Sequence, residues 1–392
     1  MKKLHIQKFI EEHSDWENII QEKPYCISIN KDTMFGRNLA LLKYNQIESD
    51  FKNPIVQECR GLILDIDTKE LISVPFYKFF NAGETNAAEI DWKTAWTSEK
   101  LDGSICKVVR LGDDLIISTN GVIDSYKAPI QPIYLADAGE LDTFGKLFEV
   151  AVKNAMIKNG YDSSVSYMEW FKDLLDEGYT YIFELTSPYN KVVVSWKTTE
   201  IHFIGCRNNQ TLEECRFFEH KLSKVFHTPE IFLLGNLSEC VEAAEKLDSN
   251  HEGFVVCDAN FNRIKVKSTL YCGLHHMKNN GVMSFSSGID VVRNGELDEV
   301  LSYFPEFADH LKKIKSDIDN LCIVIKDAWN RYQEIDSSLE TRKDKAVKIT
   351  STEYFGRYAG VGFALLDGKI NSIDEWIKNI ENVKLMKLLD YK

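Results

Sequence analysis

Alternating apolar and polar residues mark short strands through the first 120 residues of the chain. Leu62 to Ile66 and Leu71 to Val74 flank a polar turn and predict a β-hairpin. Ile105 to Val109 and Leu115 to Ser118 predict a second hairpin, joined through a turn that contains a glycine. This part of the chain is therefore expected to hold closely spaced antiparallel strands.

Helical spacing of apolar residues interrupts the strand pattern in two places. Ile6, Phe9 and Ile10 recur at helical intervals near the N-terminus, and residues 166–177 carry four apolar residues on one stripe. Further strands are expected at Tyr179 to Leu185, Lys191 to Trp196, Ile201 to Cys206, Gly253 to Cys257 and Arg263 to Lys267. The pattern predicts an α+β domain built on antiparallel sheets.

The pattern changes after about residue 280. Apolar residues then step by three or four positions, which is the period of a helix seam, at Ile314, Ile318, Leu321, Ile325 and Trp329. Further helices are expected at Thr350 to Leu366 and Ile373 to Leu389. The break near Asn279-Asn280-Gly281 predicts a boundary between a first domain, residues 1–280, and an all-α domain, residues 281–392.

Composition restricts the class of protein. The 392 residues have ordinary apolar and charged fractions and a formal net charge of −13, so any nucleic-acid partner must be bound by a local basic surface. The segment from Cys257 to Asn294 has a net charge of +3 and could supply one. No run of 18 apolar residues occurs, and nine scattered cysteines fit a reducing compartment. We expect a cytoplasmic protein, neither secreted nor membrane-spanning.

A lysine in the sequence Lys100-Leu101-Asp102-Gly103-Ser104 is the strongest local sign of chemistry. It precedes a turn glycine and a strand, where loss of water and nearby cations would lower its pKa and make its amine a nucleophile. Gly103 would let the backbone pass close to a ligand. A solvated lysine before a turn is the alternative interpretation.

Charged residues on the later strands strengthen the catalytic interpretation. Glu184 ends one strand, Glu252 opens the next, and Lys265 and Lys267 share one face of a third by the two-residue period. Two lysines on one face form a clamp suited to a triphosphate. Strand-end surface carboxylates and an exposed edge strand protected by lysines are the alternatives.

Taken in order, these segments resemble the motifs of covalent nucleotidyltransferases, the superfamily of ligases and capping enzymes. Two upstream segments, Glu58-Cys59-Arg60-Gly61 and Lys78-Phe79-Phe80-Asn81, resemble the phage RNA ligase 1 family of ATP-dependent tRNA-repair ligases. Asn190 to Val194, Phe203 to Arg207 and the helical tail are also similar to that family. The resemblance covers nearly the whole chain.

The resemblance implies a role for each motif residue. Lys100 would become covalently adenylylated by ATP, and Arg60 and Lys78 would assist around the nucleotide phosphates and in the step after adenylylation. Lys265 and Lys267 would bind phosphates. Glu184 would contact the ribose or position magnesium, and Glu252 would organise magnesium and its waters. For Arg60, a structural ion pair is the alternative.

The implied substrate is RNA with 5′-phosphate and 3′-hydroxyl ends, and a nicked tRNA selected by the helical domain. The resemblance to a bacteriophage family implies a monomer that acts in the cytoplasm, which is that of the host cell if the protein is viral. A DNA ligase or a GTP-dependent capping enzyme is the alternative within the superfamily, but these usually carry a strand-rich OB-fold after the catalytic domain. A catalytically silent RNA-binding relative is an alternative of another class.

One position departs from the family pattern. The family usually carries a basic residue just before a glycine in the second hairpin, whereas this chain has Asn120-Gly121. Asn120 cannot supply a positive charge. The stretch Tyr126 to Gly178 is also longer than expected, and we expect an inserted helical element there.

Overall fold

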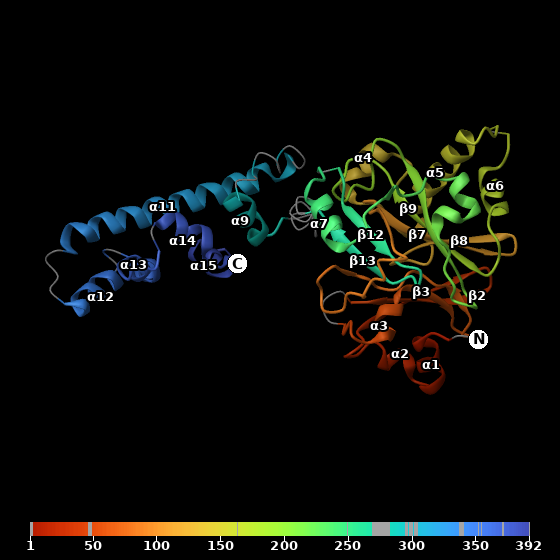
Figure 1. The fold of residues 1–392 in the computed structure, drawn as a ribbon, viewed down its shortest axis with the longest axis horizontal. Helices are drawn as coiled ribbons and strands as arrows, with labels where there is room; N and C mark the ends of the chain where they lie inside the picture. Colours follow the sequence, from red (N-terminus) through yellow and green to blue (C-terminus); the bar gives the residue numbers. More distant parts are fainter. Residues whose placement is uncertain are drawn as a thin grey trace. The chain divides into compact units, whose positions relative to one another are not determined.

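Two compact units, Met1–Cys272 and Gly273–Lys392, make up the chain in a computed structural model (Figure 1). The structure describes residues 3–391 except 46–48, 163, 249, 269–282, 295–296, 298–300, 302–304, 337–340, 352, 354 and 371. The boundary expected near Asn279-Asn280-Gly281 lies outside the described residues.

The first sheet of unit 1 lies next to the N-terminal helices. Its order is β1-β2-β3-β4, and every pair is antiparallel: β1 (Ile27–Met34), β2 (Arg37–Tyr44), β3 (Arg60–Asp65) and β4 (Leu71–Ser73). The helices α1 (His5–Glu12), α2 (Trp16–Ile19) and α3 (Pro54–Glu58) bury apolar residues against the sheet. The first predicted hairpin is confirmed by the β3–β4 pair, whereas β1 and β2 were not predicted individually.

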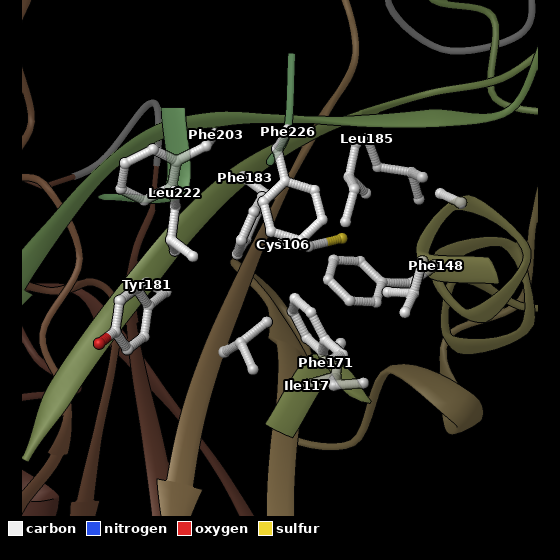
Figure 2. Packing of buried hydrophobic residues seen from close by; sticks show 14 of the residues in the cluster. Cys106, Ile117, Phe148, Phe171, Tyr181, Phe183, Leu185, Phe203, Leu222 and Phe226 are labelled. Atoms are coloured by element: carbon white, nitrogen blue, oxygen red, sulfur yellow. The ribbon is translucent and has the colours of Figure 1, made fainter. Parts of the chain in front are cut away.

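The second sheet is covered by two amphipathic helices. Its order is β10-β9-β7-β8, again antiparallel, from β7 (Ser104–Leu111), β8 (Asp114–Thr119), β9 (Tyr179–Thr186) and β10 (Glu200–Asn208). Figure 2 shows Phe148 of α5 (Phe144–Lys158) and Phe171 of α6 (Tyr167–Asp173) packed with Phe183 of β9, and all three are fully buried. The helical content expected between Tyr126 and Gly178 is confirmed.

The third sheet carries the strand with the two motif lysines. Its order is β11-β6-β12-β13-β5, from β5 (Phe80–Asn81), β6 (Trp96–Glu99), β11 (Ile231–Phe232), β12 (Gly253–Cys257) and β13 (Arg263–Lys267). All its pairs are antiparallel except β13 with β5. On β13, Ile264 and Val266 pack into a core with α7 (Leu237–Glu245), which leaves Lys265 and Lys267 on the opposite face.

Short helical segments complete unit 1. They are η1 (Ser125–Lys127), η2 (Pro132–Tyr134), α4 (Leu135–Ala138), η3 (Phe217–Glu219) and η4 (Lys221–Lys224). The predicted strand from Lys191 to Trp196 is wrong, because this segment has no strand pairing. Its backbone N–H groups at Val193 and Val194 instead donate to the Asp102 carboxylate.

The described part of unit 2 consists of helices joined by loops. They are α9 (Phe285–Asn294), η5 (Pro305–Phe307), α11 (Ala308–Asp336), α12 (Arg342–Thr350), η6 (Gly356–Tyr358), α13 (Ala359–Leu366), α14 (Ile373–Asn379) and α15 (Asn382–Leu388). The predicted seam lies on α11, where Ile314 and Ile325 are fully buried and Trp329 is partly buried. The α+β class with helices in the C-terminal region is confirmed. No helix among the described residues is long and apolar enough to cross a membrane.

Candidate active site

A cavity in unit 1 brings together charged residues from four strands. We call it the Lys100 cavity; its volume is about 180 Å³. Six charged side chains expected from the sequence line it, namely Arg60, Lys100, Glu184, Glu252, Lys265 and Lys267. Lys78 does not line this cavity; it lies beside it, in a second hollow that also contains Phe79.

Lys100 follows β6 directly and is held at both its backbone and its side chain. Its backbone N–H donates to the carbonyl of Gly253 (2.8 Å), and its Nζ donates to Glu252 Oε2 (2.6 Å). Burial alone would lower the pKa of Lys100, but the nearby carboxylates of Glu252 and Glu184 outweigh it and raise that pKa above its ordinary value. The expected lowered pKa is therefore wrong for the ligand-free protein: Lys100 rests there as a paired ammonium.

Glu252 joins two lysines in the cavity. Its second oxygen, Oε1, lies 2.9 Å from Lys267 Nζ, so the carboxylate bridges Lys100, just after β6, and Lys267 on β13. Burial would raise the pKa of Glu252, but the two ammonium groups hold it below its ordinary value. Glu252 is thus a buried, ionised carboxylate.

Glu184 has a raised pKa, in contrast to Glu252. It lies on β9 and is 9% exposed, and burial raises its pKa to about 8, assisted by repulsion from Glu252 and Asp102 and opposed by Lys100 and Arg60. Glu184 and Glu252 therefore differ in charge near neutral pH. Burial thus outweighs the attraction of Lys100 and Arg60, and a cation bound at this carboxyl would favour its ionised form.

Asp102 positions the loop that carries Lys100. Its Oδ2 accepts from the backbone N–H groups of Val193 (2.8 Å) and Val194 (2.6 Å), and its carbonyl accepts from the Trp196 indole (2.7 Å). Gly103 also has a structural role, since an added Cβ would lie 2.4 Å from the carbonyl oxygen of Leu185. The tight approach at Gly103 is thus to the β9 backbone, which differs from the expected approach to a ligand.

The face of β13 toward the cavity is strongly cationic. Arg263, Lys265 and Lys267 alternate with buried apolar residues. Burial, together with repulsion from Lys78, Lys100 and other cations, lowers the pKa of Lys265 to about 7. The cavity therefore holds more positive charge than its carboxylates neutralise, as a triphosphate site requires.

Arg60 and Lys78 approach the cavity from β3 and from the segment before β5. The Arg60 guanidinium lies 5.4 Å from the centre of the Phe79 ring. Lys78 Nζ lies 5.0 to 5.7 Å from three aromatic ring centres, those of Tyr44, Phe51 and Phe80. Burial, followed by repulsion from Arg60, lowers the pKa of Lys78.

Several residues of the site were not identified from the sequence. Trp96 and Phe217 add aromatic surface to the cavity, and Arg263 adds a guanidinium that is bound to the buried carboxylate of Glu214. Arg263 shares the two-residue period of Lys265 and Lys267, which could have identified it. Trp96 and Phe217 are distant in sequence and gave no comparable signal.

Lys107 is the most unusual residue that was missed. It is completely buried on β7, and its Nζ donates to the carbonyls of Gly61 (2.6 Å) and Thr119 (2.8 Å). An added Cβ on Gly61 would lie 2.7 Å from this Nζ and 2.8 Å from Asn120 Cα. A lysine of the neighbouring strand thus lies beside Asn120, but burial lowers its pKa to about 7, so it replaces the missing positive charge only in part at neutral pH.

The carboxyl groups of the Lys100 cavity determine whether magnesium could be held there. The described residues contain no group of three or more His, Cys, Asp or Glu side chains placed to hold a metal ion. Magnesium retains most of its waters and needs only one or two carboxylates beside substrate phosphates. Glu184, with its raised pKa, fits such a role, whereas both oxygens of Glu252 are already bound by lysines.

Comparisons with known proteins agree on one family. The RNA ligase family of the T4 RNA ligase 1 type matches residues 58–271, more than half of the chain. A protein of Autographa californica nuclear polyhedrosis virus, provisionally named a bifunctional polynucleotide kinase/RNA ligase, is 29% identical over 290 residues, 71% of this chain and 38% of the relative. A provisionally named RNA ligase of Thermovibrio ammonificans is 26% identical over 243 residues, 58% of this chain and 55% of the relative.

The chain thus spans between about a third and just over half of the length of these two relatives. Among solved structures, an archaeal ATP-dependent RNA ligase is similar with 13% identity and a TM-score of 0.44, covering 93% of this chain and 99% of that one.

Proposed function

We propose that this chain, which belongs to the RNA ligase family, is an ATP-dependent RNA ligase that carries AMP on Lys100 during its reaction. The observation that supports this most directly is the placement of Lys100, partly buried and paired with Glu252, in a cavity rich in charged groups. Four further cations line this cavity, Arg60, Arg263, Lys265 and Lys267, together with three carboxyl groups, Glu99, Glu184 and Glu252. A nucleophilic amine beside a phosphate-binding surface is what transfer of a nucleotidyl group requires.

The first step begins with release of Lys100 from Glu252. The paired ammonium cannot attack, because its lone pair holds the proton that the pairing stabilises. The Lys100 cavity of about 180 Å³ is also smaller than the roughly 300–1,000 Å³ of ordinary ligand pockets. ATP must therefore displace side chains as it enters, and the Lys100–Glu252 ion pair is the contact that lies in its way.

Once released from Glu252, the Lys100 ammonium loses a proton to water, and the free amine attacks the α-phosphorus of ATP and gives a second proton to water as the phosphoramide forms. A phosphorus–nitrogen bond forms, the bond from the α-phosphorus to the bridging oxygen breaks, and pyrophosphate leaves with that electron pair. Lys265, Lys267 and Arg60 stabilise the negative charge that grows on the phosphate oxygens. Magnesium, held by Glu184 through water, would neutralise further phosphate charge.

The second and third steps use RNA. An oxygen of an RNA 5′-phosphate attacks the AMP phosphorus, the phosphorus–nitrogen bond breaks, and Lys100 recovers its electron pair and a proton. A 3′-hydroxyl then attacks the activated 5′-phosphate, loses its proton and releases AMP. Arg60 is the cation best placed to serve both nucleotide and RNA, because it lines two adjoining hollows.

Unit 2 supports the choice of RNA over DNA as the substrate. Its described residues are helical, whereas the strand-rich OB-fold of DNA ligases and capping enzymes would require a sheet there. We propose that residues 1–280 form the adenylyltransferase domain and that residues 281–392 select a nicked tRNA by its shape. We further propose that the protein acts as a monomer in the cytoplasm. If the protein comes from a phage, this is the cytoplasm of the host cell.

The test is self-labelling with ATP carrying a labelled α-phosphate, in the presence of magnesium. We expect label on the protein that survives denaturing electrophoresis and is released by acid, as a lysine phosphoramide is. Lys100→Ala and Lys100→Arg should both abolish it, since arginine keeps the charge but stays protonated. Lys93→Arg, a change at an exposed lysine, is the matched control. Undiminished label on Lys100→Arg would contradict the assignment of Lys100, and no label on the wild type would favour a silent RNA-binding relative.

A further inference from the structure

A second cationic hollow lies on the other side of Arg60 from the Lys100 cavity. We call it the Lys43 hollow; its volume is about 770 Å³. Nine residues line it, among them Lys43, Arg60, Tyr44, Asn45 and Asn120. None of the nine is acidic, although the chain as a whole has a net charge of −13.

The two cations of the hollow are neighbours in the sheet. Lys43 of β2 and Arg60 of β3 are directly paired across the antiparallel strands. In the described part of the chain, neither side chain forms an ion pair with a carboxylate, whereas Lys31 on β1 of the same sheet is bound to Glu17 at 2.6 Å. Like charges directly opposite one another destabilise a sheet, so this pair points to an anionic ligand.

The turn that follows β8 contributes Asn120 to the hollow. Lys43 Nζ lies 3.6 Å from the position of a Cβ on Gly121, and the Asn120 side-chain oxygen is buried without a hydrogen-bond partner. Behind this turn lies the buried Lys107, whose burial lowers its pKa to about 7, so that it is only partly charged at neutral pH. A polar atom that is buried without a partner, on a residue that lines a hollow with Lys43 and Arg60, fits a site completed by a ligand.

We infer that the Lys43 hollow binds the 5′-phosphate end of the RNA strand that receives AMP. This assignment rests on the proposed function. Arg60 lines both hollows, so a phosphate bound against Arg60 and Lys43 adjoins the cavity in which Lys100 would carry AMP. A volume of about 770 Å³ is sufficient for a nucleotide. Lys43 is therefore a substrate-binding residue that the sequence motifs do not contain.

The test compares two RNA oligonucleotides of one sequence, with a 5′-phosphate and with a 5′-hydroxyl, using the full-length protein. Binding is measured at one fixed salt concentration, because phosphate contacts depend on salt. We expect Lys43→Ala to weaken binding of the 5′-phosphate oligonucleotide by about tenfold and to leave the 5′-hydroxyl oligonucleotide unchanged. Lys43→Arg should restore most of the preference, and Lys31→Ala is the matched control on the same sheet.

The same variants are then assayed in single reaction steps. Lys43→Ala is expected to raise KM for transfer of AMP to 5′-phosphorylated RNA, while self-labelling with ATP reports separately on the proposed function. An equal loss of affinity for both oligonucleotides would overturn the assignment, because it indicates general backbone binding. So would unchanged binding, or a defect confined to the 3′-hydroxyl strand when pre-adenylylated RNA is supplied.

Discussion

Replacing the buried lysine of β7 should make the pH dependence of stability different from that of the wild type. Lys107 is completely buried, and burial, followed by repulsion from Arg60, lowers its pKa from the ordinary 10.5 to about 7. Lys107→Met keeps a side chain of similar length without the charge. The variant also removes the donors to the carbonyls of Gly61 and Thr119, a cost that does not depend on pH.

The sign and size follow from proton linkage. Between pH 7 and 10.5 the unfolded chain keeps the Lys107 proton, whereas the folded protein releases it, so the unfolded state binds more protons. The stability of the wild type therefore rises with pH in this window, by at most about 1.4 kcal/mol per pH unit. Relative to Lys107→Met, the wild type should gain on the order of 2 kcal/mol between pH 7 and 9.

Urea unfolding followed by tryptophan fluorescence measures this difference. Five of the seven tryptophans precede residue 272, at Trp16, Trp92, Trp96, Trp170 and Trp196. Comparing two proteins at each pH cancels the titration of all other groups that the substitution leaves unperturbed. Lys93→Met, at an exposed lysine, should show no such trend. A stability difference between wild type and Lys107→Met that stays constant from pH 7 to 9 would refute the lowered pKa of Lys107.

Three further predictions concern the Lys100 cavity and the helical unit. Lys265 has a pKa of about 7, partly through repulsion from Lys100, so the test uses a Lys100→Arg background, which keeps that charge but cannot attack ATP. In this background the affinity for ATP should fall above pH 7 by up to about tenfold per pH unit. Lys265→Arg should flatten this decline in a binding titration, and an equally steep decline would contradict it. Glu184→Gln should gain stability relative to the wild type as pH rises from 5 to 8. The reason is that folded Glu184, with a pKa of about 8, still binds a proton that the carboxyl of the unfolded chain has released. Urea unfolding at each pH measures this difference, and a difference that does not grow with pH would argue against the raised pKa. A chain ending at Cys272 should remain folded by circular dichroism and label itself with ATP, but lose its preference for nicked tRNA over a linear oligonucleotide; an unchanged ratio of the two sealing rates would exclude tRNA selection by the helical unit.

Local pattern was sufficient for the elements that carry the motifs. The two-residue period placed Lys265 and Lys267 on one face of β13, because alternate side chains of any strand point to opposite sides. The helix seam on α11 was likewise visible, because burial of one face imposes the period of 3.6 residues. These features depend on neighbours within one element, and the sequence alone therefore determines them.

Only the tertiary structure decided which charges meet and with what effect. Lys100 and Glu252 are 152 residues apart, and their contact at 2.6 Å reverses the expected direction of the Lys100 pKa shift. The apolar segment from Lys191 to Trp196 had the pattern of a strand, but the Asp102 carboxylate takes its backbone N–H groups. Pairing across the sheets likewise set Lys43 against Arg60 and buried Lys107 beside Asn120. Electrostatic energy depends on distance and burial in three dimensions, and neither can be read from the spacing of residues along a chain.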